Sequence, residues 1–217
     1  MRELRSIKSK LVGGLLALVV TVPAQAGAFC SIPSEADASA CEAAVYLDGD
    51  DTTQLLDCND SLLKQKRHAD ALLALTSGLS VYSNTSQLLR QRGRAWFSKG
   101  DFSCALLDIT AAIEIEPDNH QGYYFRGITF SSQKQPSLAL AELNRAIELN
   151  PKYSAAYLFR AISYEQLSDL ERAYSDVRRY LREFPDNPIG NRIMRRLEEG
   201  IEMRKGFGCA MDAASCG

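Results

Sequence analysis

Apolar and polar residues between Ser86 and Asn187 follow the period of amphipathic helices, and the whole pattern returns every 34 residues. When the chain is aligned as units 86–119, 120–153 and 154–187, two helical stripes recur in each unit. The fourth, eighth and eleventh residues form one stripe, and the twentieth, twenty-fourth and twenty-seventh form the other. The residues at these places are Leu89, Gly93, Trp96, Ala105, Ile109 and Ala112, then Tyr123, Gly127, Phe130, Ala139, Leu143 and Ala146, then Tyr157, Ala161, Tyr164, Ala173, Val177 and Tyr180. The pattern therefore predicts two helices in every unit.

Residue size along these stripes predicts how the two helices pack. Small residues at the eighth and twentieth places let the helix axes approach closely, and the aromatic ring at the eleventh fills the space beside that contact. Between the helices lie the short stretches KGDF at 99–102, KQPS at 134–137 and LSDL at 167–170, and all three are plausible turns. The second helix of each unit is expected to end near a proline, and these prolines are Pro117, Pro151 and Pro185.

A 34-residue helix–turn–helix unit of this kind resembles the tetratricopeptide repeat. The three copies read RGRAWFSKGDFSCALLDITAAIEIEP, YYFRGITFSSQKQPSLALAELNRAIELNP and YLFRAISYEQLSDLERAYSDVRRYLREFP. The resemblance covers 86–187, close to half of the chain, and it implies an all-α, right-handed superhelical solenoid. Two places depart from the family pattern. Tyr180 replaces a small residue, and 134–136 replaces the usual Gly-Asp-aromatic turn.

The segments on either side of the three units are predicted to extend the solenoid. Residues 52–85 have the length of one more unit, and four repeat positions are filled as expected, by Leu55, Leu62, Ala71 and Leu75. Asn59 and Gly78 fit the eighth and twenty-seventh places poorly, so this segment is either a degenerate repeat or a plain helical hairpin. Residues 188–205 have polar side chains on most faces, as expected for a helix that caps a solenoid, and 206–217 form a Cys-containing tail.

The first 26 residues have the three-part layout of a secretory signal peptide. Four basic residues in MRELRSIKSK are followed by the apolar run LVGGLLALVVTV and by the small residues of AQA at 24–26. This apolar run is shorter than the roughly 20 residues that a membrane-spanning helix needs. Nothing later in the sequence is long and apolar enough to span a membrane. We therefore expect residues 1–26 to be cleaved and the chain to be exported to the periplasm or secreted.

Charge narrows the range of partners. The formal net charge is −2, and removal of the signal peptide, with its four basic residues and one acidic residue, leaves −5. Eight acidic residues and no Lys or Arg lie between 27 and 63, so 27–51 is predicted to be an acidic, Cys-containing segment. Nucleic acid is not an expected partner, because the chain carries no overall basic field.

The six cysteines, which all follow the predicted signal peptide, are Cys30, Cys41, Cys58, Cys104, Cys209 and Cys216. An even number of cysteines in an exported chain favours disulfide bonds, although six cysteines allow 15 pairings that the sequence does not distinguish. A local Cys209–Cys216 bond is the favoured pairing. No metal site is predicted, because zinc sites need paired ligands at shorter spacing.

No motif predicts catalysis or a cofactor. His68 and His120 are the only histidines, and neither can be assigned to a Cys–His pair with a third orienting group. The DGDD stretch at 48–51 lacks the ligand spacing of a calcium loop and is more simply an acidic turn before a helix. The chain is therefore predicted to act without catalysis. An enzyme with a site in the N-terminal segment is the less favoured alternative.

One charge pattern recurs in phase with the repeat. The seventh residue of each unit is an arginine and the twenty-third is a carboxylate; these residues are Arg92, Arg126 and Arg160, and Asp108, Glu142 and Asp176. The pattern predicts ion pairs that bridge the two helices of a unit or adjacent units. Their expected role is structural.

In proteins of the family that this chain resembles, the first helices of successive units line a concave groove that usually holds a peptide or a partner segment. The resemblance places twelve residues there: Gln87, Arg90, Arg94, Phe97, Gln121, Tyr124, Ile128, Ser131, Ala155, Leu158, Ile162 and Glu165. Such a groove would be basic at one end and apolar toward the other, and would suit a segment with a carboxylate and apolar anchors. In the alternative interpretation, Leu158 and Ile162 pack beneath the capping region, and Arg90 and Arg94 are only solvated.

Some members of the family bind the C-terminal carboxylate of a chaperone through a set pattern of Lys, Asn and Arg. The matching places here hold Arg90, Arg94, Phe125, Ala155 and Phe159. Only the charge at Arg90 is kept, so the sequence does not favour that partner. The favoured hypothesis is an adaptor in the bacterial cell envelope that binds a protein or peptide. The alternative is a structural subunit of a cell-wall, secretion or outer-membrane assembly that uses its convex face or its ends, and an oligomer is compatible with either.

Overall fold

The described part of the protein is a stack of helices. The computed structural model describes residue 30 and residues 52–82 and 85–211, so the predicted signal peptide and most of the acidic segment lie outside it. Within these residues there are nine helices and no strand, which confirms the predicted all-α repeat fold. The helices are α3 (Thr53–Lys64), α4 (His68–Leu79), α5 (Thr85–Lys99), α6 (Phe102–Ile115), α7 (His120–Ser132), α8 (Pro136–Leu149), α9 (Ser154–Gln166), α10 (Leu170–Glu183) and α11 (Pro188–Met211).

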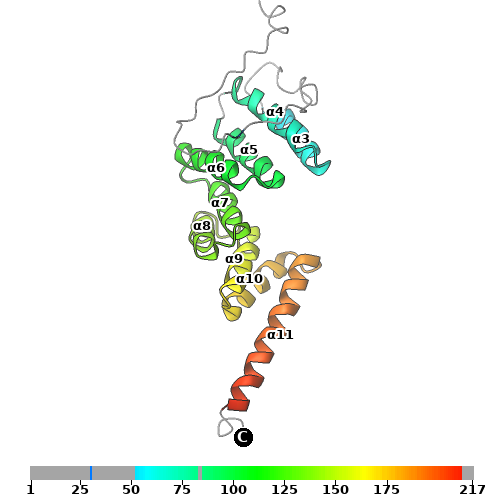
Figure 1. Ribbon diagram of the computed structural model, residues 1–217, viewed down its shortest axis with the longest axis vertical. Helices are drawn as coiled ribbons and strands as arrows, with labels where there is room; N and C mark the ends of the chain where they lie inside the picture. Colours follow the sequence, from blue (N-terminus) through cyan, green and yellow to red (C-terminus); the bar gives the residue numbers. More distant parts are fainter. Residues whose placement is uncertain (1–29, 31–51, 83–84, 212–217) are drawn as a thin grey trace, which may run out of the picture.

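Each predicted unit is a helical hairpin, and the hairpins stack in chain order (Figure 1). The pairs α5 and α6, α7 and α8, and α9 and α10 pack closely, and the first helix of each unit also packs on the second helix of the unit before it. The first helices α3, α5, α7, α9 and α11 additionally touch one another in succession, whereas no such contact joins the described second helices α4, α6, α8 and α10. The stack is therefore tighter along the row of first helices.

The turn inside each hairpin has the same backbone geometry. Lys66, Gly100, Lys134 and Ser168 have φ values of 61°, 94°, 61° and 63°, and they stand 34 residues apart. Left-handed backbone favours glycine, yet lysine and serine adopt it here because the following helix fixes the turn. The QKQP turn before α8 therefore reproduces the turn of the other units despite its different sequence. Lys66 gives the α3–α4 hairpin the same turn in the same phase.

Close contact between the paired helices depends on the small residue at the eighth place. A Cβ atom added to Gly93 would lie 2.6 Å from Ile109 Cγ1, and one added to Gly127 would lie 2.8 Å from Leu143 Cγ. The third unit has Ala161 at this place, and the side chain opposite it is the smaller Val177. The pairs are therefore complementary in size, and the close approach brings both helices' apolar stripes out of water.

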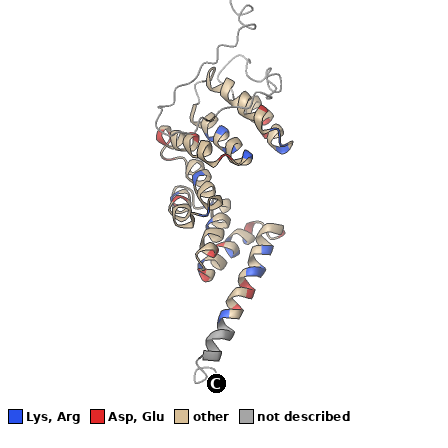
Figure 2. Cartoon of the chain, in the orientation of Figure 1, with Lys and Arg blue, Asp and Glu red and all other residues tan. Residues whose placement is uncertain are grey.

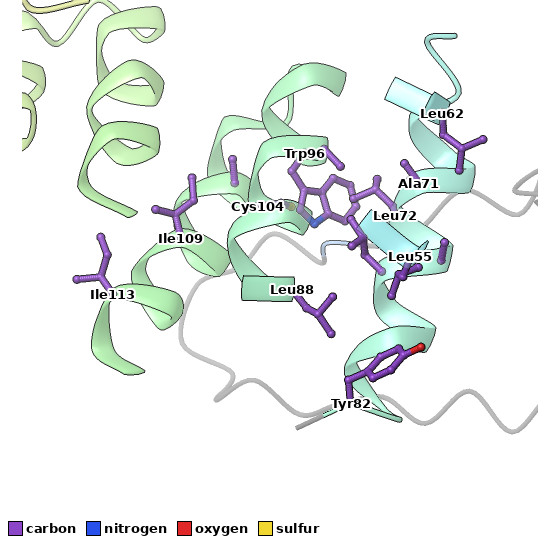
Figure 3. Packing of buried hydrophobic residues seen from close by; sticks show 14 residues of the cluster. Leu55, Leu62, Ala71, Leu72, Tyr82, Leu88, Trp96, Cys104, Ile109 and Ile113 are labelled. Atoms are coloured by element: carbon purple, nitrogen blue, oxygen red, sulfur yellow. The ribbon is translucent and has the colours of Figure 1, made fainter. Parts of the chain in front are cut away.

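The N-terminal hairpin and the first full unit share one core (Figure 3). Leu55, Leu72 and Leu75 from this hairpin are fully buried beside Leu88 and Trp96 of α5. Gly78, which fits the repeat pattern poorly, has a packing reason of its own: an added Cβ would lie 2.4 Å from Leu55 Cδ2. Residues 52–82 thus pack on the solenoid as another unit would.

Asn59 is the exception in this hairpin. Its side chain is fully buried at the eighth place, and neither Oδ1 nor Nδ2 has a hydrogen-bond partner among the described residues. A buried amide without partners costs about 1–3 kcal/mol. We expect Asn59→Leu, which puts apolar atoms where the amide atoms lie, to raise the free energy of unfolding by about 1 kcal/mol in urea denaturation. Asn59→Asp, which buries a charge, should destabilise the protein, and the prediction fails if both variants shift stability in the same direction.

The C-terminal helix α11 closes the stack. Ile193 and Leu197 are buried against α9 and α10, in a cluster with Leu158, Tyr164 and Val177. The helix continues to Met211, beyond the limit of 205 expected from the sequence, and the stretch after Arg204 contains no proline that would remove a backbone donor. None of the helices in the described ranges is long and apolar enough to cross a membrane.

A disulfide bond ties residue 30 to the first full unit. The Sγ atoms of Cys30 and Cys104 lie 2.07 Å apart, and Cys104 is buried on α6. Cys58 of α3 is disulfide-bonded as well. The expected Cys209–Cys216 bond lies outside the described side chains.

Candidate functional site

The row of first helices forms the inner face of the stack and is the candidate site. Because α3, α5, α7, α9 and α11 touch in succession while the described second helices do not, the stack curves toward the first helices. Residues that point away from the second helices therefore line the inside of the curve. We call this surface the inner face.

Ion pairs hold each inner helix to its outer partner. Arg92 donates from Nε and Nη2 to the two carboxylate oxygens of Asp108, each at 2.7 Å, and Arg160 does the same with Asp176 at 2.7 and 2.8 Å. Arg126 Nη2 lies 2.9 Å from Glu142 Oε2, at ion-pair distance but without hydrogen-bond alignment.

Two of these arginines also reach the outer helix of the preceding unit. Arg92 Nη1 donates to Thr76 Oγ1 at 3.2 Å, and Arg160 Nη1 donates to Asn144 Oδ1 at 2.8 Å. All three arginines therefore bridge the helices of their own unit, and Arg92 and Arg160 also bridge adjacent units behind the inner face.

Aromatic side chains cluster in the middle of the inner face. The Tyr124 ring packs edge-on against Phe125, Tyr153 and Phe159, with centroid distances of 5.2, 5.0 and 5.7 Å. The His120 ring centroid lies 4.7 Å from that of Tyr153, and His120 Nε2 accepts a 3.3 Å hydrogen bond from Asn150 Nδ2. All five rings are only partly buried, so this aromatic cluster presents a surface spanning α7 and the start of α9.

A cation stands beside this cluster. Arg94 Nη1 of α5 donates to Asp60 Oδ1 of α3 at 2.6 Å, and both side chains are more than one-third exposed. Burial raises the pKa of Tyr124 well above its usual value and Tyr153 adds to the effect, whereas the charge of Arg94 acts in the opposite direction. Burial likewise raises the pKa of Tyr153 against the charge of Arg94. Both phenols therefore stay neutral, and Arg94 lies within electrostatic range of both.

Arg90 has a structural role, because its side chain is bonded within the chain. Its side chain is 9% exposed and donates from Nη1 to Ser86 Oγ at 2.9 Å and to Glu116 Oε2 at 2.8 Å. Partial burial raises the pKa of Glu116, but hydrogen bonds from Asn119, Ser86 and Arg90 and the charge of Arg90 outweigh this, so the pKa is lowered. Burial, with the charge of Arg90, also lowers the pKa of His120, which is therefore neutral at pH 7.

The helix α11 covers the far end of the inner face. Leu158 is 7% exposed in the cluster that α11 completes, and Ile162 packs against the same cluster. Glu165 accepts hydrogen bonds from Arg196 of α11 at 2.5 and 2.6 Å. The sequence left open whether Leu158 and Ile162 pack beneath the cap, and this is where the structure places them. The apolar end of the sequence-derived groove is therefore occupied by the chain itself.

The remaining groove candidates fall into two groups. Ile128 and Ser131 are buried, and Phe97 packs against the core and against Phe102 at 5.6 Å. Gln87, Gln121 and Ala155 are partly exposed, as are Arg94 and Tyr124. Tyr153 and Asp60 are inner-face residues that the repeat pattern did not indicate. Tyr153 is the last residue of its unit, and its place directly before α9 was the available signal.

No group of three or more His, Cys, Asp or Glu side chains in the described part of the chain is arranged to hold a metal ion. The accessible chemistry of the inner face is therefore that of aromatic rings, amides and one partly exposed arginine–carboxylate pair. Such groups bind segments of other chains by packing and hydrogen bonding.

Comparisons with known proteins agree with the geometry. Residues 124–188 match the sequence profile of the family described as tetratricopeptide repeat. No curated protein matches the sequence. One similar solved structure is the first TPR of Spaghetti (RPAP3) bound to the HSP90 peptide SRMEEVD, with 25% identity and a TM-score of 0.54 over 55% of this chain and 95% of that chain.

Two bacterial structures share the fold over a longer stretch. TTC0263, a thermophilic TPR protein of Thermus thermophilus, is 19% identical with a TM-score of 0.61, over 69% of this chain and 82% of that chain. A tetratricopeptide repeat protein from Parabacteroides merdae is 20% identical with a TM-score of 0.57, over 69% of this chain and 59% of that chain. The repeat phase, the paired helices, the profile match and the shared fold together show that this chain contains tetratricopeptide repeats.

Proposed function

We propose that the protein is a non-catalytic adaptor that holds a segment of a partner protein against α5, α7 and the start of α9. The observation that carries this proposal is the partly exposed aromatic cluster around Tyr124 of α7, with the partly exposed Arg94 on the adjoining helix α5. Aromatic rings supply large contact area at low entropic cost, and they are enriched where proteins bind one another. A cation beside them adds orientation.

The partner chemistry follows from what remains accessible. A segment with one apolar or aromatic anchor would pack on Tyr124, Tyr153 and Phe159, and a carboxylate on the same segment would replace Asp60 at Arg94. The segment would be short, because α11 occupies the inner face from Leu158 onward. An extended peptide or a single helix fits this description.

The similar Spaghetti domain binds an HSP90 peptide, SRMEEVD, which supports peptide binding by this kind of inner face. The same partner is not proposed here. Of the charges that the family pattern would require, the sequence keeps only Arg90, and Arg90 is buried and bonded to Glu116. Its charge is already neutralised within the chain.

The proposed location is the bacterial cell envelope, reached by cleavage of residues 1–26. The layout of that segment and the even number of cysteines support it. We expect protein purified from the exporting host to show no reactive thiols until it is unfolded and reduced. Reduction of the Cys30–Cys104 bond, which spans 74 residues, should lower the free energy of unfolding by about 2–4 kcal/mol. Six reactive thiols in the unfolded, unreduced chain would contradict export.

The binding proposal is tested by affinity capture from the host with the native chain and an Arg94→Glu, Tyr124→Ala variant. The matched control is Arg178→Glu, Tyr174→Ala, which changes an exposed arginine and a partly buried tyrosine on the outer helix α10. We expect the inner-face variant to lose a specific partner that both the native chain and the control retain, with the thermal midpoints of the two variants within a few degrees of each other. If all three recover the same partners, the inner face is not the site, and a structural role through the convex face or the ends takes its place.

A further inference from the structure

The exposed side of α11 is sorted by charge. Arg192, Arg195 and Arg196 come first, and Glu198, Glu199 and Glu202 follow, as the basic and then acidic bands on this helix show (Figure 2). Arg192, Arg195, Glu199 and Glu202 lie at helical spacing on the side opposite the buried Ile193 and Leu197. All four of these side chains are exposed, whereas Ile193 and Leu197 are buried against α9 and α10. The exposed face of α11 is therefore a basic half followed by an acidic half.

Two large apolar side chains flank the charges. Ile189 is 54% exposed and Met203 is 62% exposed, which makes them the two most exposed large apolar residues among the described side chains. They lie about four turns apart and on the same side of the helix, since the series 189, 192, 196, 199 and 203 follows a heptad stripe. Exposed apolar residues at both ends of a charged stripe are unfavourable in water unless something covers them.

Along the helix, the apolar pair is centred on Arg196 and the six charged residues are centred on the next residue, Leu197. Ile189 and Met203 are equally distant from Arg196, and the three arginines and three glutamates are arranged symmetrically about Leu197. In an antiparallel pair of identical helices that cross at this point, Ile189 of one copy would meet Met203 of the other. The basic half of each helix would then lie opposite the acidic half of its partner copy.

We propose that this face of α11 is a self-association surface whose occupant is a second copy of the chain, docked antiparallel about a two-fold axis near Arg196. A two-fold axis makes each contact occur twice, so one self-complementary stripe is enough to build the interface. A parallel pair would instead put the arginines of the two copies side by side, and the charge order argues against it.

Arg196, the residue at the two-fold axis, does not prevent this arrangement by charge repulsion. Arg196 would lie close to its own copy, but it already donates to Glu165 of α9 from Nε and Nη2 at 2.5 and 2.6 Å. Each copy therefore contributes a neutral Arg–Glu pair to the centre. Arg204 is also engaged, since Nη2 donates to the Ser168 carbonyl at 2.8 Å.

The interface is small. One face of about four helical turns buries less than the ~1,200 Å² below which interfaces are weak and transient. Association should therefore depend on concentration and on salt, because much of its specificity comes from exposed charges. The surface is separate from the inner face, so its failure would leave the proposed adaptor function unaffected.

Sedimentation equilibrium tests the proposal on the chain in the form that the host produces. We expect the average mass to rise toward that of two chains as the protein concentration is raised from about 1 µM to 1 mM.

Arg192→Glu and Glu199→Arg should each raise the dissociation constant about tenfold or more, because each places like charges opposite one another at two symmetric contacts. The double variant carrying both changes restores opposite charges and should return the constant to within about threefold of the native value. Met203→Glu should weaken association, and Arg178→Glu on α10 should leave it unchanged.

A monomer at every concentration would overturn the proposal. So would a dimer that is insensitive to these α11 changes, or single variants that weaken association without recovery in the double variant. Unchanged circular dichroism spectra would show that each variant is folded, since all of the changed side chains are exposed.

Discussion

Replacing Arg92 by alanine is expected to lower the free energy of unfolding by about 3–5 kcal/mol. Asp108, its partner, has a side chain that is only 8% exposed, and Arg92 supplies both of its 2.7 Å hydrogen bonds from a guanidinium group. Without Arg92 the carboxylate would be a buried charge with no counter-ion. Loss of the 3.2 Å bond to Thr76 would also loosen the contact between the first full unit and the hairpin before it.

The pH dependence of this variant has a definite sign. Burial raises the pKa of Asp108, and the hydrogen bonds and charge of Arg92 act against that rise. Removing Arg92 leaves the effect of burial less opposed, so the folded-state pKa should rise further above the unfolded value. A carboxyl group with a raised folded-state pKa destabilises the folded protein increasingly as pH rises from the unfolded value toward the folded one. The stability gap between native protein and variant should therefore narrow as the pH is lowered toward about 4.

Two further variants test whether the unpaired Asp108 carboxylate causes the loss of stability in Arg92→Ala. Arg126→Ala removes the equivalent residue of the second unit, whose ion pair is more exposed and lacks hydrogen-bond alignment, and should cost only about 1–2 kcal/mol. Arg92→Ala with Asp108→Ala removes the orphaned charge and should cost less than Arg92→Ala alone. Urea denaturation at several pH values measures all of these. A double variant less stable than the single one would mean that packing, and not the buried charge, is responsible.

The repeat made most of the fold predictable from the sequence. Helix pairs, their small residues at close contacts and the recurring arginine–carboxylate pairs all follow from one period, because identical local solutions recur every 34 residues. The turn before α8 looked like a departure, yet Lys134 adopts the left-handed backbone of Gly100. A local sequence difference was outweighed there by the packing of the helices on either side.

The candidate site was less predictable because it depends on the ends of the stack and on single side chains. Whether Leu158 and Glu165 face a partner or the cap is decided by the register of α11, which no repeat position fixes. Arg90 looked like a groove cation, but its partner Glu116 lies in the irregular link between units. Tyr153 joins the inner face from a similar link. Side chains in such links escape a pattern based on helical stripes.

The eighth-place contact gives the second large effect: Gly127→Leu should cost at least about 3 kcal/mol. A Cβ atom alone would lie 2.8 Å from Leu143 Cγ and 3.1 Å from Leu143 Cδ2, so a full leucine must force α7 and α8 apart. A leucine introduced at an exposed site of the same hairpin, Ala141→Leu on α8, should alter stability by less than about 0.5 kcal/mol. A thermal midpoint unmoved by Gly127→Leu would contradict the repeat phase itself.

The third unit supplies a compensating change. There the eighth place holds Ala161 and the facing residue is Val177, one methylene smaller than Leu143. Gly127→Ala should therefore destabilise the protein by about 1 kcal/mol, and Gly127→Ala with Leu143→Val should be more stable than the sum of the two single changes predicts. A coupling energy near zero in this cycle, measured by urea denaturation, would show that the two residues do not share one packing constraint. A favourable coupling of about 1 kcal/mol would show that helix spacing in every unit is set by the combined size of this pair.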